Sequence, residues 1–263
     1  MERMIFMSRK FTVIGHPLGH TMSPFIHDAL FRLSGLPGEY GAQDIPPEEL
    51  SARYADLQRL AGFNVTIPHK QAIIPLLDRL DDSAARYRAV NTVACGKQAV
   101  GYNTDAYGFL KALQTSGISL GGPVLLCGCG GVARTMAYEC LLAGGPLTLA
   151  VRESDLPAAR ALAAELQQAI DDARVDIVRL DEAQGSFDLL INATPVGMYP
   201  RCDAMPVDEK LLAGCRHVFD AIYNPRKTLL LRAAERLGIP TVGGMPMLVW
   251  QAVRAHEIWD GTV

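Results

Sequence analysis

The 263-residue sequence lacks an excess of basic residues, since its 25 lysines and arginines are outnumbered by 28 aspartates and glutamates. A protein that grips nucleic acid neutralises phosphates with a basic surface, so a formal charge of −3 argues against a nucleic-acid partner. The balance remains compatible with a small anionic metabolite. With 49% hydrophobic residues, the chain has enough apolar material for one large core or two of ordinary size.

Long hydrophobic runs are also missing. No segment offers 18 consecutive apolar residues, and the opening MERMIFMSRK lacks the apolar stretch of a signal peptide. We therefore expect neither export nor membrane insertion, and predict a cytoplasmic protein.

Metal-binding patterns are absent as well. The six cysteines form no CxxC pair and the six histidines no HExxH motif, so the usual spacing of a zinc site is not met and we predict no metal. Buried thiols in a reducing compartment are the expected state of the cysteines.

What the chain does contain is a regular alternation of strand and helix patterns, which predicts an α/β protein with largely parallel sheets. In the first part, the predicted strands are 11–15, 38–45, 63–67 and a hairpin of 89–95 with 98–105, and the predicted helices are 24–33, 47–60, 71–80 and 106–116. In the second part, the predicted strands are 123–127, 147–151, 175–180, 187–194, 217–223 and 239–244, and the predicted helices are 132–143, 156–170, 208–212 and 228–237.

Two domains follow from this order. Six strands with interleaved helices match a doubly wound Rossmann domain that binds a dinucleotide, which we place at 106–243. The last amphipathic run, 247–259, cannot join that sheet. We therefore expect it to return to a substrate-binding α/β domain made of 1–105 and completed by 244–263.

A glycine cluster supports the dinucleotide site. In PVLLCGCGGVAR, Gly128, Gly130 and Ala133 have GxGxxA spacing between a predicted strand and a predicted helix. Small residues there allow a tight turn and close backbone approach to a pyrophosphate, which the free amides of the helix receive. Dinucleotide binding is favoured over a purely structural turn.

The segment AVRESD should decide whether the cofactor carries a 2′-phosphate. Arg152 could hold a phosphate or stack on adenine, whereas Glu153 could bond the ribose hydroxyls and repel a phosphate. Arg152 therefore favours NADP and Glu153 favours NAD, so both cofactors remain open.

Polar residues in the first half gather at predicted strand ends and turns. Each alone is more commonly an ordinary turn or cap residue, but in open α/β sheets ligands bind beyond the carboxyl ends of the strands. Hydroxyls and amides there suit a ligand rich in hydroxyl groups. The residues concerned are Thr21, Ser23, Asn64, Thr66, Asn91, Asn103, Thr104 and Asp105.

Lys70 stands out among them, because the pattern of GFNVTIPHKQAI puts it in the first turn of a helix, where a cation is disfavoured. The ordinary interpretation is an exposed lysine draped over the surface. The alternative is a lysine placed to hand on a proton. Lys70 and Asp105 could converge on one substrate hydroxyl, whose proton must leave when a hydride is transferred from its carbon.

Eight motifs, in order and at about the family's spacing, resemble the shikimate dehydrogenase family, which includes quinate/shikimate dehydrogenases. They span nearly the whole chain: GHTMSP, NVTIPHK, AVNT, GYNTD, GCGGVAR, NATPVGM, YNPRKT and GMPMLVWQ. The resemblance implies reversible reduction of 3-dehydroshikimate to shikimate with a nicotinamide cofactor, most often NADP, between two α/β domains. This step belongs to the shikimate pathway of aromatic amino acid biosynthesis.

The resemblance also implies residue roles. Lys70 and Asp105 would be the catalytic pair. Thr21 and Ser23 would bind the substrate carboxylate. The substrate hydroxyls would be held by Thr66, Asn91, Asp105, Tyr223 and Gln251. The cofactor would be bound by Gly128, Cys129, Gly130, Gly131, Val132, Arg152, Glu153, Ala221 and Gly244.

Two departures from the family pattern bear on specificity. The carboxylate-binding pair is commonly two serines around a lysine, but here Thr21 and Ser23 flank Met22. Relative to the family pattern, the threonine adds a methyl group and the methionine removes a positive charge, and both changes could alter the choice of substrate. The adenosine motif commonly carries a second arginine where this chain has Leu156, and Glu153 adds a carboxylate.

We therefore expect an NAD(P)-dependent oxidoreductase for shikimate, or for a close analogue such as quinate or an amino derivative. The alternative is a dinucleotide-binding or sensing protein of the same fold with weak or no dehydrogenase activity. The expected partner is a small hydroxylated carboxylate, and the expected state a monomer or homodimer.

Overall fold

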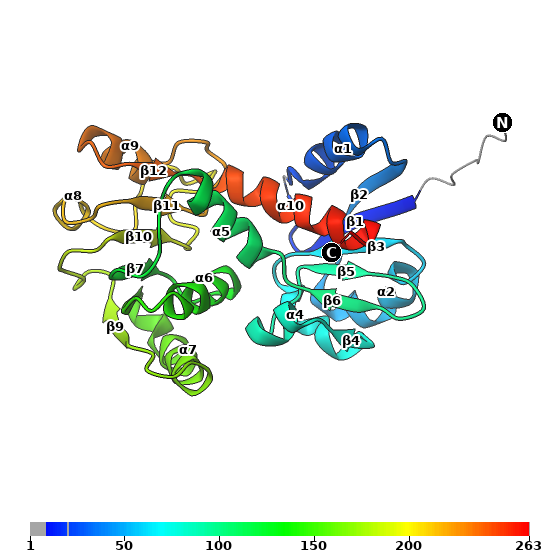
Figure 1. The fold of residues 1–263 in the computed structure, drawn as a ribbon, viewed down its shortest axis with the longest axis horizontal. Helices are drawn as coiled ribbons and strands as arrows, with labels where there is room; N and C mark the ends of the chain where they lie inside the picture. The colour runs from blue at the N-terminus through cyan, green and yellow to red at the C-terminus, as the bar shows by residue number, and fades with distance from the viewer. Residues whose placement is uncertain (1–8, 20, 263) are drawn as a thin grey trace. The chain divides into compact units, whose positions relative to one another are not determined.

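The computed structural model describes residues 9–19 and 21–262 and divides the chain into two compact units (Figure 1). The first unit consists of Met1–Thr104 with Gln251–Val263, and the second of Asp105–Trp250. Each unit contains a six-stranded sheet with helices packed on it, so the predicted α/β class is confirmed. Within the described residues, no helix is both long and apolar enough to span a membrane.

The sheet of the first unit mixes parallel and antiparallel strands. β1 pairs in parallel with both β2 and β3, whereas β5 runs antiparallel to β3 and to β6, as the predicted hairpin requires. In spatial order the strands are β2 (Gly38–Asp44), β1 (Arg9–Gly15), β3 (Gly62–Val65), β5 (Thr92–Ala94), β6 (Val100–Tyr102) and β4 (Arg79–Leu80).

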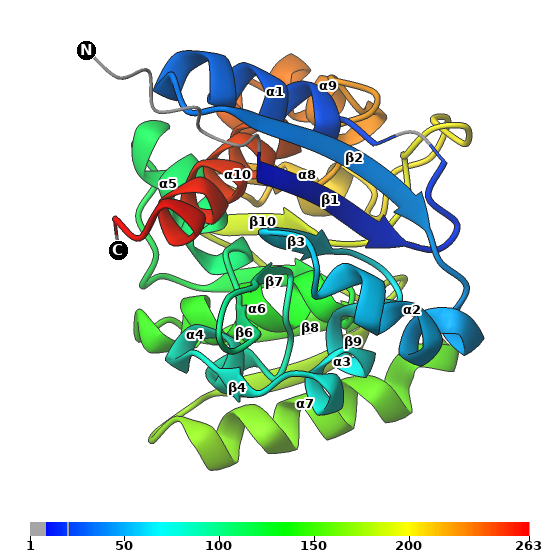
Figure 2. The ribbon, with the colours of Figure 1, turned by 90° about the vertical axis from the view of Figure 1, so that its right-hand side faces the viewer.

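The longer helices between the strands of this sheet are α1 (Ser23–Ser34), α2 (Leu50–Leu57) and α4 (Asp82–Tyr87). α1 lies beside β1 and β2 (Figure 2). A fully buried apolar cluster that includes Ile14, Leu57 and Phe63 fills the interior. This packing aligns the carboxyl ends of β1 and β3, where several predicted site residues follow.

The predicted helix over residues 71–80 is wrong. The segment forms a single turn, α3 (His69–Ala72), then a 3-10 turn over Ile74–Leu76 and the short strand β4, which pairs with β6. Pro75 explains the break, because a proline has no amide hydrogen to continue a helix and its ring clashes with the preceding turn. The helix α4 was not predicted.

The second unit is a doubly wound parallel sheet, as predicted. Its strands lie in the order β12 (Thr241–Val242), β11 (Val218–Asp220), β10 (Leu189–Asn192), β7 (Val124–Cys127), β8 (Leu147–Val151) and β9 (Val175–Arg179). All five pairings are parallel. The chain order reverses between β7 and β10, and such a reversal is where ligands bind in this architecture.

In the second unit α5 (Asp105–Thr115) precedes the first strand of the sheet, and four helices lie between its strands: α6 (Gly131–Leu142), α7 (Leu156–Ala169), α8 (Glu209–Leu212) and α9 (Leu229–Arg236). The core contains Leu125, Leu190 and Val218, none of which is exposed to solvent. Strands of this kind are apolar throughout, since helices cover both faces of a parallel sheet.

The last helix, α10 (Gly244–Asp260), returns to the first unit, as predicted. Its residues up to Trp250 belong to the second unit and those from Gln251 onward to the first. Near its end, the Trp259 indole nitrogen donates a hydrogen bond to the Val93 carbonyl at 3.0 Å. The centroid of the Trp259 ring lies 4.4 Å from the centroid of the Phe11 ring. The chain therefore closes the core of its first unit with its last helix.

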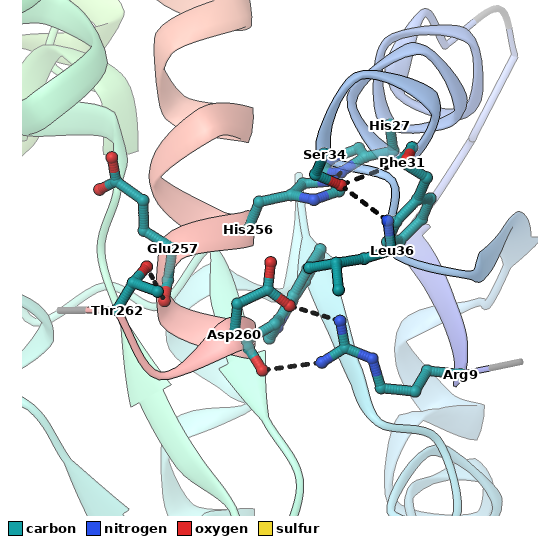
Figure 3. A network of polar contacts seen from close by, with 10 residues as sticks. Arg9, His27, Phe31, Ser34, Leu36, His256, Glu257, Asp260 and Thr262 are labelled. Carbon is teal, nitrogen blue, oxygen red and sulfur yellow. Dashed lines mark hydrogen bonds and ion pairs between the residues drawn. The ribbon is translucent and has the colours of Figure 1, made fainter. Parts of the chain in front are cut away.

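A histidine pair is buried where α10 meets α1 (Figure 3). The Nε2 atom of His256 lies 3.0 Å from Nδ1 of His27, and the His27 ring stacks on Tyr40 with 4.0 Å between ring centroids. Burial lowers the pKa of His27 well below its usual value and that of His256 to about 4. Both rings are therefore neutral near pH 7.

Candidate functional site

Lys70 lies in the one-turn helix α3, directly after the fully buried His69. The Nε2 atom of His69 lies 2.7 Å from the Ile45 carbonyl oxygen, and the Lys70 carbonyl accepts a hydrogen bond from the Val90 amide. These contacts fix the backbone on both sides of the lysine. A single turn carries little macrodipole, so the expected conflict between Lys70 and a helix N-terminus is weak.

Thr21 and Ser23 are brought together at the start of α1. The Thr21 hydroxyl donates to the Ser23 hydroxyl at 3.1 Å, and the Ser23 amide donates to the Thr21 hydroxyl at 3.2 Å. Both side chains are partly exposed. Two adjacent hydroxyls can donate hydrogen bonds to an incoming carboxylate once they turn away from each other.

Asn91 and Gln251 also meet, with Thr104 between them. The Asn91 amide nitrogen donates to the Thr104 hydroxyl at 3.0 Å and approaches the Gln251 side-chain oxygen at 3.5 Å. The Thr104 amide donates to the Asn91 side-chain oxygen at 2.8 Å, which fixes the orientation of the asparagine. Residues 160 positions apart thus form one polar cluster in the first unit, and Thr104 has a direct part in it.

A second layer holds this cluster in place. Asn64 donates from its side chain to the Asn91 carbonyl at 3.1 Å and accepts from the Tyr40 hydroxyl at 2.6 Å. Tyr40 was not expected at the site. No pattern in its strand distinguishes it, because its contribution depends on the parallel pairing of β1 with both β2 and β3.

Thr66 follows β3 and is held by its backbone, since its amide donates to the Ile14 carbonyl at 2.9 Å. Its methyl group packs against Gly15, where an added Cβ would come within 2.5 Å of it. Gly15 is therefore required for Thr66 to lie beside the end of β1.

Asp105 is the first residue of α5 and is buried, with 6% of its surface exposed. It follows Thr104, whose amide is bonded to Asn91. Acidic residues suit the first turn of a helix, because they face its free amides.

The glycine turn has the features of a phosphate-binding loop. Gly128 has a φ of +107°, which L side chains rarely adopt, and a Cβ there would meet the Ala193 carbonyl and the Thr194 methyl group. Gly130 caps α6 and Gly131 begins it, and a Cβ on either would meet nothing within 4 Å. Cys129 and Val132 are partly exposed and Ala133 is fully buried. The backbone is thus open to a ligand, and the turn fits a dinucleotide.

Arg152 and Glu153 follow β8 and both are exposed. The Arg152 Nε donates to Asp155 at 2.8 Å. Glu153 lies 3.8 Å from Arg179, which also donates two hydrogen bonds to Asp181. Sequence reasoning missed Arg179, whose position at the end of the neighbouring strand β9 could have indicated it. Carboxylates outnumber guanidinium groups here, which disfavours a 2′-phosphate.

Ala221 and Gly244, both predicted to lie beside the cofactor, are in close backbone contact. A Cβ on Gly244 would come within 2.2 Å of the Ala221 carbonyl, and the Gly244 amide donates to the Ile222 carbonyl at 3.0 Å. Tyr223 follows and is partly buried, which raises the pKa of its phenol.

The structure therefore groups most predicted residues within their own units. In the first unit Thr21 contacts Ser23 and Asn91 contacts Gln251; in the second unit Ala221 contacts Gly244, and the glycines share one turn. Across residues 9–19 and 21–262, no group of three or more histidine, cysteine, aspartate or glutamate residues could hold a metal ion.

Comparison with known proteins finds that residues 13–93 match the family model described as the shikimate dehydrogenase substrate binding domain. Among curated relatives, the shikimate dehydrogenase (NADP(+)) of Shouchella clausii is 41% identical over 97% of this chain and 94% of its own length.

Solved structures resemble the fold over nearly its whole length. The shikimate 5-dehydrogenase of Thermus thermophilus, in complex with NADP(H) and shikimate, is 36% identical with a TM-score of 0.86, covering 96% of this chain and 94% of the other. The enzyme of Listeria monocytogenes, in complex with shikimate and NAD, is 28% identical with a TM-score of 0.87, covering 99% and 94%.

Proposed function

Because the chain belongs to the shikimate dehydrogenase family, we propose that it is an oxidoreductase that interconverts shikimate and 3-dehydroshikimate with a nicotinamide dinucleotide. The observation that carries the proposal is the 41% identity to a curated shikimate dehydrogenase across 97% of the chain. At that coverage both the substrate-binding part and the dinucleotide-binding part are shared.

In the proposed mechanism, Lys70 and Asp105 act on the hydroxyl that is oxidised. The bound dinucleotide supplies chemistry that a side chain cannot, by accepting or donating a hydride. When the alcohol is oxidised, its hydroxyl proton passes to Lys70, and in the reverse direction Lys70 returns a proton to the carbonyl oxygen. Asp105 orients the amine and accepts a hydrogen bond from the substrate. Such proton transfer contributes about 10²- to 10⁴-fold to the rate.

The remaining polar residues bind and orient the substrate in this proposal. Thr21 and Ser23 donate to the carboxylate from their paired hydroxyls. Asn91 and Gln251 bind ring hydroxyls together, with their amide orientation fixed by Thr104, and Thr66 and Tyr223 bind further hydroxyls. The methyl of Thr21 and the neighbouring Met22 are the proposed origin of any preference between shikimate and quinate.

The cofactor is proposed to lie on the turn of Gly128 to Val132, with its adenosine end at Arg152 and its nicotinamide end beside Ala221 and Gly244. NADP is the proposed physiological cofactor, because the Shouchella relative is named as an NADP(+) enzyme. The carboxylates around Arg152 and Arg179 oppose it, so NAD is the competing choice.

We propose the domain limits 1–105 with 244–263 for substrate binding and 106–243 for the cofactor, which differ from the compact units by assigning Asp105 and residues 244–250 to the substrate domain. A cytoplasmic location is supported by the six cysteines, all of which carry free thiols. Whether the protein is a monomer or a homodimer stays a prediction.

An assay crossing NAD and NADP with shikimate and quinate tests the proposal. We expect reduced cofactor to form with shikimate, at a higher kcat/KM than with quinate. Tight cofactor binding by calorimetry, with no oxidation of either acid at high enzyme concentration, would instead favour a dinucleotide-binding or sensing protein.

A further inference from the structure

A buried polar cluster lies at the carboxyl ends of β10 and β11 in the second unit. It consists of Asn192, Asp220 and Thr228, and none of the three is exposed to solvent. They belong to the segments NATPVGM, HVFDAIY and YNPRKT, and none of the three side chains has a part in the site described so far.

Asp220 is the centre of this cluster because its carboxylate accepts three hydrogen bonds. Oδ2 accepts from the Thr228 hydroxyl at 2.6 Å, and Oδ1 accepts from the Asn192 side chain and from the Ile222 amide, both at 3.1 Å. The bond to Ile222 fixes the backbone between Ala221 and Tyr223. That backbone also bonds to Gly244 through the Ile222 carbonyl.

Asn192 extends the cluster to the neighbouring loop. Its side-chain oxygen accepts from the Thr194 amide at 3.0 Å and from the Thr194 hydroxyl at 2.7 Å, and its amide nitrogen also donates to the Val196 carbonyl. Thr194 packs on Gly128 in the phosphate-binding turn. One chain of contacts therefore links the glycine turn to the segment that carries Ala221 and Tyr223.

The arrangement has a cost that a purely structural role does not explain. All three donors to Asp220 are neutral, and burial raises the pKa of its carboxyl to about 6. A carboxylate buried without a cation destabilises a fold. Nor is Asp220 needed to cap α9, because the Thr228 hydroxyl itself accepts from the Leu231 amide.

We propose that Asp220 is a positioning residue that holds the backbone of residues 221–223 against Gly244, at the nicotinamide end of the cofactor site. The inference rests on the proposed function, which gives Ala221, Tyr223 and Gly244 their places beside cofactor and substrate. Asp220 acts on hydride transfer through that backbone and leaves the pyrophosphate and adenosine contacts unchanged.

Two substitutions test the role. Asp220→Ala removes all three acceptor bonds and is expected to lower kcat/KM at least roughly 30-fold. Asp220→Asn keeps the shape and the bonds from Asn192 and Ile222, while its new amide can donate to Thr228, so it is expected to lose only about fivefold at pH 7.5. If Asp220→Asn retains most of the kcat/KM that Asp220→Ala loses, the loss is due to the missing hydrogen bonds.

Affinities separate positioning from general damage. The Kd of an adenosine fragment, ADP or 2′,5′-ADP, is expected to stay within about twofold of wild type in both variants, whereas the Kd of the whole dinucleotide rises in Asp220→Ala. The Tm of Asp220→Asn at pH 7.5 is expected to equal or exceed that of wild type, since a buried charge is removed. Equal loss of fragment and dinucleotide affinity would overturn the inference.

A pH series gives a second, independent readout. Below its pKa the carboxyl carries a proton that it can donate to Thr228, as the amide of Asp220→Asn does. The ratio of wild-type to Asp220→Asn kcat/KM is therefore expected to fall from about five above pH 7 to about two near pH 5.5, and toward one at pH 5 and below. Asp208, which accepts the Leu211 amide at the start of α8, provides the control, and the ratio for Asp208→Asn should not vary with pH.

The experiments distinguish a failure of the inference about Asp220 from a failure of the proposed function. If Asp220→Ala does not fold, Asp220→Asn still decides, and a kcat/KM ratio of one at every pH from 5 to 8 would overturn the inference. If wild-type protein turns over no substrate, the proposed function fails. The fragment and dinucleotide affinities of the variants then still decide on Asp220.

Discussion

The two units of the chain differ in which parts of their residues are the proposed ligands. In the first unit the proposed ligands are side chains, including Thr21, Lys70 and Asn91. In the second unit they are chiefly backbone, since Gly128, Ala221 and Gly244 have no polar side chain to offer. The first unit orients hydroxyls and amides through hydrogen bonds, and the second shapes its main chain with glycine and with buried acceptors such as Asp220.

This difference predicts how each unit responds to substitution. A side-chain site is altered by removing one functional group, and the loss falls on chemistry or on substrate binding. A site made of backbone groups tolerates many side-chain substitutions. It does not tolerate an added Cβ at a residue with positive φ, or where two backbone segments are in contact. Substrate specificity should therefore be more easily changed in the first unit than cofactor binding in the second.

The largest effect is expected from Lys70→Ala. Loss of the proton carrier should lower kcat about 10³-fold, or roughly 4 kcal/mol of barrier, while the Kd of the cofactor stays within twofold. Steady-state kinetics and cofactor titration measure the two quantities, with Lys97→Ala in the β5–β6 turn as control. A kcat within threefold of wild type would exclude the acid/base role.

Gly128→Ala tests the backbone site. The new Cβ is strained at a φ of +107° and approaches Thr194 and Ala193, so we expect the cofactor Kd to rise roughly tenfold or more, about 1.4 kcal/mol, with a lower Tm. Gly117→Ala is the matched control, because its φ is +71° but its Cβ meets nothing within 4 Å. If both variants lose stability and neither loses cofactor affinity, Gly128 has no part in binding.

The third prediction contrasts the buried titratable groups of the two units. His27 and His256 have folded pKa values below those of the unfolded chain, so protons bind preferentially to the unfolded state. The free energy of unfolding is therefore highest above about pH 6.5, where both histidines are neutral in either state, and it falls as the pH drops toward 4. Asp220 acts oppositely: its pKa of about 6 exceeds its unfolded value, so its contribution to stability rises as pH falls from 6 to 4.

The two contributions can be separated by substitution. Between pH 7 and 4.5, wild type should lose about 2 kcal/mol of unfolding free energy relative to His256→Gln, measured with urea at each pH. Tyr40 stacks on His27 in both proteins. Both proteins also keep the ion pair between Arg9 and Asp260 (Figure 3). His217→Asn, at a half-buried histidine of the second unit, is the control. Parallel pH curves for wild type and His256→Gln would contradict the prediction.

The smallest effect is expected at the adenosine end. Glu153→Gln removes an exposed charge near Arg152 and Arg179, so the ratio of kcat/KM for NADP over NAD should rise roughly three- to tenfold, about 1 kcal/mol. Glu235→Gln on α9 is the control. An unchanged ratio would mean that Glu153 does not face the 2′ position.

Much of this architecture was predictable from the sequence, because its signals are local. The β8 strand was predicted at its observed limits, and the glycine turn was recognised from small residues between a strand and a helix. The segment after Lys70 was not, because helical spacing was given more weight than Pro75.

The supporting layer could not be predicted, because it depends on register. Tyr40 reaches Asn64 only when β2, β1 and β3 lie side by side, and Asp220 reaches Asn192 only when β10 pairs with β11. The sequence shows such polar residues as isolated members of apolar strands. Their partners lie 24 and 28 positions away, beyond any local pattern.

The passage of α10 from one unit to the other has a consequence for biosynthesis. The ribosome synthesises all the strands of the first unit before it reaches Trp259, the residue whose indole bonds to Val93 and packs on Phe11. The first domain to emerge therefore waits for the last segment to be translated, while the intervening domain already has all of its strands. A nascent chain arrested shortly before Trp250 would carry a protease-resistant second domain beside a first domain that is still open to cleavage.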